Sequence, residues 1–453
     1  MLALQVLVLA VTASFPVLRL EILNSTLVQQ YGARCLDGSA GGFYFAPATT
    51  AENRSKLVIF VQGGGECRTK EECDGWSGGM GSSSKGWPLS LAIEEDELSH
   101  SSQLNPDFHD WQKLFLPYCS ADMHSGTRKT RSAALGGWYF AGHSLIAGSL
   151  KALAMLPDFV EPRLVLLSGS SAGGIGALLH ADFISDHWPA ASVKAAPACG
   201  FFYAAVSSFR DWNANESTPA SKLGFISEWD PFIDETCSRA TGGNVSACTD
   251  AHFALPHIST PLFVRENLYD TAKLGNCGLD TRGPISDAGL HYLRQWGRWM
   301  RAQLGAIHGM AGKGTTGYFA PSCLEHGSNL RFSTAPLISG LSLQEALSAW
   351  FFQSAKGGKP PPRLMDECGD LPCTVAGRGE CPHVQPDPLS VECMRLLETE
   401  CHGLEQKGDP CDVCVHAHAV HLRRAGCPHS GAPVMEWYCD PSRQPAGHHV
   451  CNI

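Results

Sequence analysis

The sequence has no excess of basic residues. Its 453 residues contain 34 Lys and Arg against 44 Asp and Glu, which gives a formal net charge of -10 and a pI near 6.0. A protein that neutralises nucleic-acid phosphates needs a basic face, and this charge balance argues against one. We therefore expect no nucleic-acid partner.

Long apolar runs are also missing after the first residues of the chain. The N-terminus reads MLALQVLVLAVTASFP, and nothing later approaches the ~20 apolar residues that a membrane span needs. No Lys or Arg precedes this run, but it ends in Val11-Thr12-Ala13, which is typical of a signal-peptidase site. We predict a signal peptide over residues 1–13 and no membrane span. A buried first helix or strand is the alternative.

Cysteine, in contrast, is abundant. The chain has 19 cysteines, and in an exported protein such a number indicates disulfides rather than metal sites. Glycosylation sequons begin at Asn24, Asn53, Asn215 and Asn244. Together with the leader, these features predict a secreted, extracellular glycoprotein.

Cysteine spacing divides the chain into two parts. Nine cysteines are spread from Cys35 to Cys323 and ten crowd between Cys368 and Cys451, after a Gly/Pro stretch at residues 357–362. We predict one domain over residues 14–356, a linker over 357–367 and a small Cys-rich, disulfide-stabilised region over 368–453. That region contains residues with the close spacing of zinc ligands, namely Cys411, Cys414, His416 and His418. Because export favours disulfides, we expect no metal.

Strand-like and helix-like segments alternate before the Gly/Pro stretch. Short apolar runs typical of buried strands are KLVIFVQ, WQKLFLPY, RLVLLSG and PLFVREN. Helical candidates begin at Phe140, Ala172, Pro284 and Leu341, and the third of these has apolar residues at three- or four-residue steps, namely Leu290, Leu293, Trp296 and Met300. The alternation predicts an α/β fold whose mostly parallel central sheet is flanked by helices.

The segment from Gly169 to Gly173 fits the pattern Gly-X-Ser-X-Gly with Ser171 at its centre. It follows a predicted strand and precedes a predicted helix, as the nucleophile elbow of a hydrolase requires. The alternative is a glycine-rich turn whose serines cap the next helix. A similar segment at residues 38–42 has no long strand before it, so context favours Ser171 as the nucleophile.

Further candidates for ester hydrolysis lie on both sides of Ser171. Upstream, a strand-like run leads into the glycines at residues 63–65, whose N–H groups could bind an oxyanion; a flexible turn is the alternative. Downstream, Asp270 and His326 each follow an apolar run, in the order acid then histidine. We interpret Asp270 as the residue that orients His326, and His326 as the base. Asp280 and Asp287 remain alternatives for the acid, and His291 and His308 for the base.

Several segments of the first 356 residues resemble the pectin acetylesterase and Notum family of secreted serine carboxylesterases. They are CLDGSAGGFYF from Cys35, FVQGGGEC from Phe60, FLPYCSADMHSG from Phe115, LSGSSAGGIGALL from Leu167, NLYDTAKL from Asn267 and FAPSCLEH from Phe319. The most specific are PYCSADMHSG and GSSAGG together. The resemblance implies an α/β-hydrolase-like fold and no cofactor.

The resemblance also implies roles for individual residues. It assigns Ser171 as nucleophile, Asp270 as acid and His326 as base, and it sets the rival residues aside. The oxyanion hole would be formed by the backbone N–H groups of Gly64, Gly65 and Ala172. Two disulfides are implied by the same matches, Cys35 with Cys119 and Cys67 with Cys73.

The chain departs from the family pattern beside the glycine run. Where family members have a tryptophan after their glycines, this chain has Gly65 or Glu66, depending on the alignment. An acidic Glu66 near the site would disfavour a long apolar acyl chain. We therefore expect a pectin acetylesterase-like enzyme that removes short acyl groups from polysaccharide. The alternatives are a Notum-like deacylase acting on a long acyl ester of a protein, and a catalytically silent binding protein.

Overall fold

The computed structural model describes residues 17–93, 96–201, 226–283, 285–307, 315–327, 336–353 and 360–366, and the single positions 209, 330, 332, 371 and 372. The predicted signal peptide, nearly all of the Cys-rich region, Asn215 and His308 lie outside these residues.

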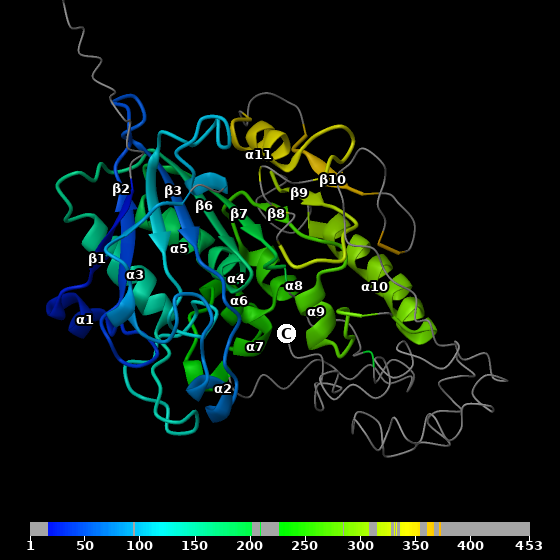
Figure 1. Ribbon diagram of the computed structural model, residues 1–453, viewed down its shortest axis with the longest axis horizontal. Coiled ribbons are helices and arrows are strands. Elements are labelled where there is room, and N and C mark those ends of the chain that lie inside the picture. The colour runs from blue at the N-terminus through cyan, green and yellow to red at the C-terminus, as the bar shows by residue number, and fades with distance from the viewer. Residues whose placement is uncertain are drawn as a thin grey trace, which may run out of the picture.

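One sheet forms the centre of the described part of the chain (Figure 1). Its ten strands lie in the order β10-β9-β8-β7-β6-β3-β5-β2-β1-β4. In chain order they are β1 (Leu18–Ile22), β2 (Gly42–Ala46), β3 (Lys56–Val61), β4 (Ser90–Leu91), β5 (Gln112–Leu116), β6 (Leu164–Ser170), β7 (Ser192–Ala198), β8 (Phe263–Arg265), β9 (Gly317–Ala320) and β10 (Arg363–Met365).

The sheet is parallel from β5 to β10 and antiparallel at the edge formed by β2, β1 and β4. The four apolar runs singled out in the sequence are β3, β5, β6 and β8, so the expected α/β class with a mostly parallel sheet is confirmed. β3 and β6 are neighbours, with Val61 opposite Gly169. Because they are parallel, the glycine run after β3 and the serines after β6 reach the same edge of the sheet.

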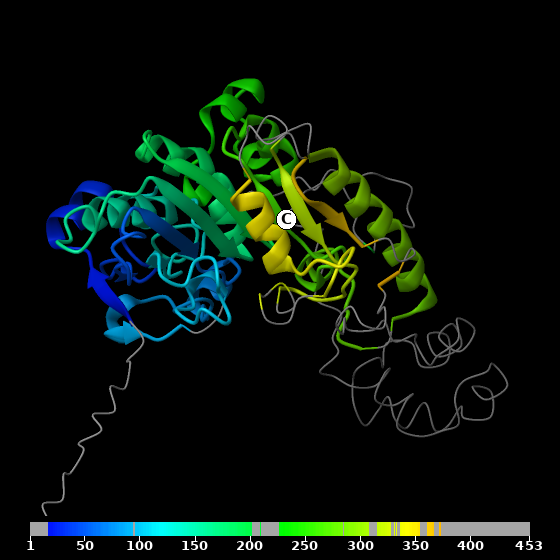
Figure 2. The same ribbon diagram turned by 90° about the horizontal axis from the view of Figure 1, so that it is seen from above.

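Helices cover both faces of this sheet, with α11 (yellow) on one side and green helices on the other (Figure 2). The helices are α1 (Ser25–Tyr31), α2 (Lys70–Asp74), α3 (Gly142–Leu153), α4 (Ala172–Leu179), α5 (Ala181–His187), α6 (Glu235–Ala240), α7 (Val245–Thr249), α8 (Ala251–Ala254), α9 (Thr271–Asn276), α10 (Asp287–Ala306) and α11 (Leu343–Phe351). Short 3-10 helices include η2 (Asp96–Leu98). The helix predicted from Ala172 is two helices, which meet at His180.

The long helix α10 shows how the apolar pattern positions the site. Leu293, Trp296 and Met300 are fully buried, as their spacing predicts. The Trp296 indole N–H also donates a hydrogen bond of 3.1 Å to the carbonyl of Leu268. This contact holds the loop after β8, in which Asp270 lies, against the core.

The predicted boundary at residue 357 needs a correction. Residues 363–365 form β10, which pairs in parallel with β9 through partners such as Leu364 and Phe319. The segment expected to be a linker thus contributes a strand, because its extended residues after Pro362 satisfy the backbone groups of the edge strand β9.

Disulfides tie the loops around the sheet. Cys35 is bonded to Cys119 across 84 residues, and Cys67 to Cys73 directly after the glycine run. A third bond, which the sequence did not single out, joins Cys237 and Cys248. Cys277 and Cys323 are also disulfide-bonded, and Cys199 is a buried free thiol. In the described segments, no helix combines the length and apolar character needed to cross a bilayer.

Three of the four sequon asparagines are described, and they differ in exposure. Asn24 and Asn244 are exposed at helix starts, where each side-chain oxygen caps the helix, so the amide nitrogen takes no part in the cap. Asn53 is only 9% exposed, and its amide nitrogen donates to Thr50 and Asp110. Because a glycan is attached to that nitrogen, glycosylation of Asn53 would break these contacts in the folded protein.

We therefore expect glycans at Asn24 and Asn244 of the protein secreted from eukaryotic cells, and none at Asn53. Peptide mass spectrometry after enzymatic deglycosylation measures this, because a released glycan leaves aspartate in place of asparagine. Conversion at residue 53 to the extent seen at residue 24 would contradict the expectation.

Candidate functional site

Ser171 lies on a sharp turn between β6 and α4. Its backbone has φ 58° and ψ -127°, a positive φ that residues with a Cβ rarely adopt. Its N–H donates to the carbonyl of Ala198 on β7 at 2.9 Å, which holds the turn. Such strain is typical of a nucleophile elbow, where it exposes the serine at the edge of the sheet.

Glycines allow this turn to form. A Cβ added to Gly173 would lie 2.0 Å from the carbonyl oxygen of Val61, and one added to Gly169 would lie 2.2 Å from the carbonyl oxygen of Gly173. The start of α4 can therefore lie against β3 and β6 only without side chains there. In the similar segment at residues 38–42, the hydroxyl of Ser39 instead accepts a hydrogen bond from the backbone of Ser84 at 3.0 Å.

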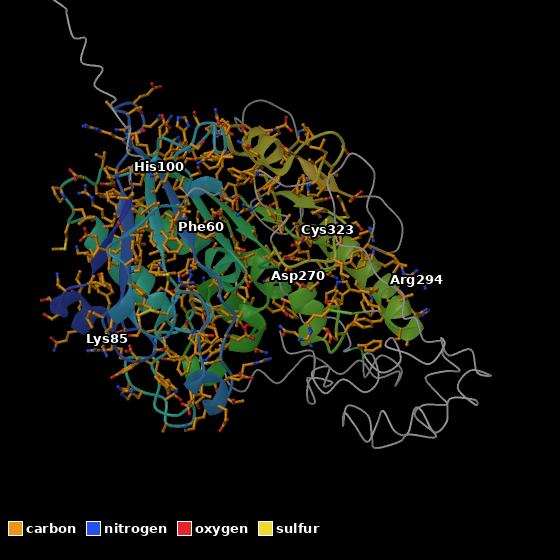
Figure 3. All side chains as sticks on the ribbon, viewed as in Figure 1. Phe60, Lys85, His100, Asp270, Arg294 and Cys323 are labelled. Carbon is orange, nitrogen blue, oxygen red and sulfur yellow. A yellow bond between two sulfur atoms is a disulfide. The ribbon has the colours of Figure 1, made fainter. Side chains whose placement is uncertain are left out.

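The structure brings Ser171, His326 and Asp270 together. The His326 Nε2 atom lies 2.8 Å from the Ser171 hydroxyl oxygen, and Nδ1 lies 2.6 Å from the Asp270 carboxylate. Asp270 is fully buried, whereas the His326 side chain is 26% exposed. Asp270 follows β8 near the centre of the molecule (Figure 3). A serine hydrogen-bonded to a histidine that a carboxylate orients can act as a nucleophile.

Two backbone features position the acid and the histidine. A parallel bridge between Tyr269 and Leu324 aligns the loop after β8 with the loop after β9. Asp270 also caps α9, because its second carboxylate oxygen accepts the N–H of Lys273 at 3.0 Å. The carboxylate is thus held from two sides, with one oxygen left for His326.

The charges in this group stabilise one another. Burial alone would raise the pKa of the Asp270 carboxyl, but the His326 ring, followed by the Lys273 cation, keeps it below its usual value. Burial likewise opposes protonation of His326, but the charge of Asp270, its hydrogen bond and the Glu266 carboxylate raise the pKa of the ring above 6.5. The pair therefore favours a carboxylate beside an imidazole that readily takes a proton.

The rival residues lie elsewhere. Asp280 is half exposed and forms an ion pair with Arg282 at 2.9 Å. His291 is an exposed residue of α10, and Asp287 is the first residue of that helix. The metal-like pattern from Cys411 to His418 lies outside the described residues.

The glycine run lies beside Ser171. A Cβ on Gly63 would be 2.9 Å from the Cβ of Ser171, and Gly65 has a left-handed backbone with φ 79°. Within the described residues, the N–H groups of Gly64, Gly65 and Ala172 donate no hydrogen bond to the protein. Unpaired N–H groups next to a nucleophile can bind an oxyanion.

A cavity of about 770 Å³ adjoins the serine. Ser171, His326 and Gly63 to Gly65 are among the residues that line it. Apolar side chains contribute much of the remaining wall, namely Phe60, Ile93, Leu98, Phe115, Ala198 and Leu330. Phe60 is labelled above Asp270 in Figure 3. The lining also includes three charged residues, namely Asp96, Glu97 and Arg265.

The expected influence of Glu66 on this cavity needs a correction. Glu66 is not among the cavity-lining residues, and its carboxylate lies 3.8 Å from Arg68. An aromatic ring does approach the glycine run, but it comes from Trp76 in the loop after α2. Its ring lies 3.8 Å from the place of a Cβ on Gly65 and packs edge-on against Tyr118.

Two buried ion pairs near the site were not predicted. Lys273 lies 3.0 Å from Glu266, and both side chains are fully buried beside Asp270. Arg265 pairs with Glu97 at 2.8 Å, with exposed fractions of 3% and 0%. Glu266 and Lys273 fall within or beside the NLYDTAKL motif, but no sequence pattern shows that they face each other.

Metal-ligating side chains come together at one place in the described residues. Ligand atoms of Cys199, Asp270 and His326 lie within 4.8 Å of one another. Because Asp270 and His326 are hydrogen-bonded to each other, this group is explained by the arrangement around Ser171. We derive no metal chemistry from it.

Comparison with known proteins identifies relatives of this chain. A family model described as Pectinacetylesterase matches residues 18–375. The chain is 29% identical over 374 residues to the mouse palmitoleoyl-protein carboxylesterase NOTUM, covering 78% of this chain and 70% of the relative. It is 25% identical to pectin acetylesterase 4 of Arabidopsis thaliana, covering 78% and 86%. A crystal structure of the Wnt deacylase Notum from Drosophila superposes with a TM-score of 0.65 at 22% identity, covering 82% of this chain and all of that one, and so shares the fold.

Proposed function

The chain belongs to the pectinacetylesterase family of carboxylic ester hydrolases, and on this premise we propose that Ser171, His326 and Asp270 are its catalytic triad. The observation that supports this best is the unbroken chain of hydrogen bonds from the Ser171 hydroxyl through His326 to Asp270, beside a cavity. The same three residues are those that the sequence resemblance implied.

The reaction follows from this geometry. The Ser171 oxygen attacks the ester carbonyl while His326 takes the hydroxyl proton, and Asp270 stabilises the resulting imidazolium. The N–H groups of Gly64, Gly65 and Ala172 bind the negative oxygen that forms. His326 then protonates the leaving alcohol, and a water molecule that it activates hydrolyses the acyl-enzyme.

For the substrate, we propose acetyl or other short acyl groups on a polysaccharide, and a secreted enzyme. The charged side chains of Asp96, Glu97 and Arg265 in the cavity wall support a short acyl group, because a long aliphatic chain would bury against them. Two relatives carry names that refer to these chemistries, one to pectin acetyl esters and one to palmitoleoyl esters of proteins.

The second candidate function is removal of a long acyl chain from a protein. The size of the cavity and the rings of Phe60 and Phe115 in its wall favour it. Hydrolysis of 4-nitrophenyl acetate, butyrate, decanoate and palmitate distinguishes the two functions. We expect kcat/KM to be highest for the short esters, and a clear preference for palmitate would overturn the proposed substrate class.

Labelling with a fluorophosphonate probe tests the triad itself. We expect the wild-type chain to be modified at Ser171, and the Ser171→Ala variant to remain unlabelled. A folded wild-type protein that resists the probe would instead support a silent binding protein on an esterase fold.

The pH dependence of the reaction should report His326. Attack requires the neutral ring, and its pKa is raised above the ordinary 6.5 by Asp270 and Glu266. We therefore expect kcat/KM for 4-nitrophenyl acetate to rise with pH through an apparent pKa above 6.5. An acid limb centred at or below 6.5 would contradict this assignment of the base.

A further inference from the structure

The charged part of the cavity wall is built by three separate elements. Glu97 lies on η2, Arg265 ends β8 and Ser168 lies on β6. The Arg265 guanidinium donates from Nη1 to Glu97 at 2.8 Å and from Nη2 to the Ser168 hydroxyl at 2.7 Å. The Ser168 hydroxyl in turn donates to Glu97 at 2.7 Å. One main-chain contact holds the guanidinium in place, since Arg265 also donates to the carbonyl of Ala196 at 2.7 Å.

This group is incompletely satisfied. The second carboxylate oxygen of Glu97, Oε2, and the Nε atom of Arg265 are buried and have no hydrogen-bond partner within the described structure. Buried charged groups normally use all of their hydrogen-bonding capacity, and leaving it unused is costly. Both residues line the cavity, so its wall contains one acceptor and one donor that the described protein leaves unused just beneath the surface.

The position of the Glu97, Arg265 and Ser168 group indicates which part of a substrate it contacts. Ser168 lies two residues before the end of β6 at Ser170, and Ser171 is on the turn that follows, so Ser168 lies about 7 Å back along the strand from Ser170 at 3.3 Å per residue. The alcohol part of the proposed substrate is a polysaccharide, and its chain continues on both sides of the esterified sugar. It therefore stays near the mouth of the cavity. The acyl group is a chain end and can reach the interior.

Neighbouring charges restrict the kind of polar group that fits. Asp96 also lines the cavity, and burial together with the Glu97 charge raises its pKa to about 6. At neutral pH two carboxylates therefore face one guanidinium. These two side chains would repel a free carboxylate at the far end of the acyl group. A neutral hydroxyl there can both donate to Glu97 and accept from Arg265.

We propose that Glu97 and Arg265 form a polar subsite at the inner end of the acyl pocket, which selects acyl groups that carry a hydroxyl at their far end over aliphatic groups of the same length. An extended six-carbon acyl chain with a terminal hydroxyl spans roughly 7 to 8 Å, because bonds of about 1.5 Å follow a zigzag, and this length is comparable to the depth of Ser168. The inference rests on the proposed esterase function and on the acyl group entering this cavity.

Matched methyl esters test the subsite, with proton release followed in a pH-stat. Methyl 6-hydroxyhexanoate and methyl heptanoate have the same number of heavy atoms, and monomethyl adipate carries a carboxylate in place of the hydroxymethyl group. We expect wild-type kcat/KM to be about tenfold higher for the hydroxylated ester than for methyl heptanoate, and lowest for monomethyl adipate. If only the transfer of the acyl group from water to an apolar pocket mattered, kcat/KM would be higher for methyl heptanoate than for the hydroxylated ester, because heptanoate is the more apolar.

A double variant provides the second measurement. Glu97→Met with Arg265→Met replaces the pair by apolar side chains of similar volume, a change that buried pairs often tolerate. In the variant we expect the ratio of the hydroxylated ester to methyl heptanoate to fall below one, and its thermal unfolding shows whether the comparison is made on folded protein. If the variant does not fold, the wild-type ratio still decides.

The outcomes separate the inference from the function on which it rests. A wild-type enzyme that hydrolyses methyl butyrate but prefers methyl heptanoate over methyl 6-hydroxyhexanoate overturns the subsite. So does a folded double variant whose ratio is unchanged. A wild-type protein that hydrolyses none of the esters, methyl butyrate included, overturns the esterase function itself.

Discussion

Replacing Ser171 with alanine is expected to lower kcat/KM for 4-nitrophenyl acetate by about 10⁴-fold or more. The hydroxyl oxygen that His326 contacts at 2.8 Å is removed, so no acyl-enzyme can form. Alanine retains the Cβ of serine, so the positive φ of this turn is as tolerable as before. The N–H groups of the glycine run remain, and only a small residual rate from substrate binding is expected.

Ser39→Ala is the matched control for this variant. Ser39 also lies in a Gly-Ser-Ala-Gly-Gly segment, but its hydroxyl bonds to Ser83 and Ser84 rather than to a histidine. We expect this control to retain wild-type kcat/KM. Stopped-flow or plate-reader assays on both variants, with circular dichroism to verify folding, decide the matter. Retention of more than a few per cent of activity in folded Ser171→Ala would refute the assignment of the nucleophile.

The central sheet could be predicted because its strands have simple apolar patterns. β3, β5, β6 and β8 are short apolar runs with clear breaks, and each was recognised. β7 was not, because SVKAAPA carries a lysine and a proline and depends on its neighbours for burial. β10 follows the prolines that suggested a linker, and only pairing with β9 makes it a strand. Tertiary contact overrides local composition at both places.

Some residues of the candidate site could also be predicted from local sequence, and others could not. Ser171 and the glycine run have local signals, since a sharp turn after a strand requires small residues at fixed spacing. Asp270 and His326 were selected from several candidates by family resemblance, and the structure shows the bridge of Tyr269 to Leu324 that brings them together. The buried pairs had no signal, because the partners are separated along the chain and their burial is a property of the fold.

Glu66 illustrates why proximity in sequence is a poor guide to the acyl pocket. It follows the glycine run directly, but its carboxylate turns toward Arg68. The charges that line the cavity come from Asp96, Glu97 and Arg265, which are distant in the chain. We therefore expect these three residues, rather than Glu66, to influence which acyl groups are accepted. Tests of specificity should change them.

Lys273→Met is expected to lower the free energy of unfolding by about 3–5 kcal/mol, because it leaves the buried Glu266 carboxylate without its cation. The double variant Glu266→Gln with Lys273→Met should recover most of this loss, since glutamine can still accept the Phe201 N–H that Glu266 accepts at 3.1 Å. Urea unfolding of the two variants and the wild type measures the difference. Exposed Lys70, which pairs with Asp74 on the surface, provides a matched control, and Lys70→Met should unfold like the wild type.

The pH dependence of the Lys273→Met defect distinguishes a lost charge pair from lost packing. Burial already raises the pKa of Glu266 to about 7 in the presence of Lys273, and loss of the cation raises it further. A carboxyl whose pKa is higher in the folded state than in the unfolded state stabilises the fold below the unfolded value, about 4.5, and loses this contribution as pH rises through the folded value. The variant should therefore be markedly less stable at pH 8 than at pH 5.5, whereas the double variant, which has no carboxyl at residue 266, should not show this added sensitivity. Equal destabilisation at both pH values would mean that Lys273 acts through its packing, and the charge balance around Asp270 would then need another explanation.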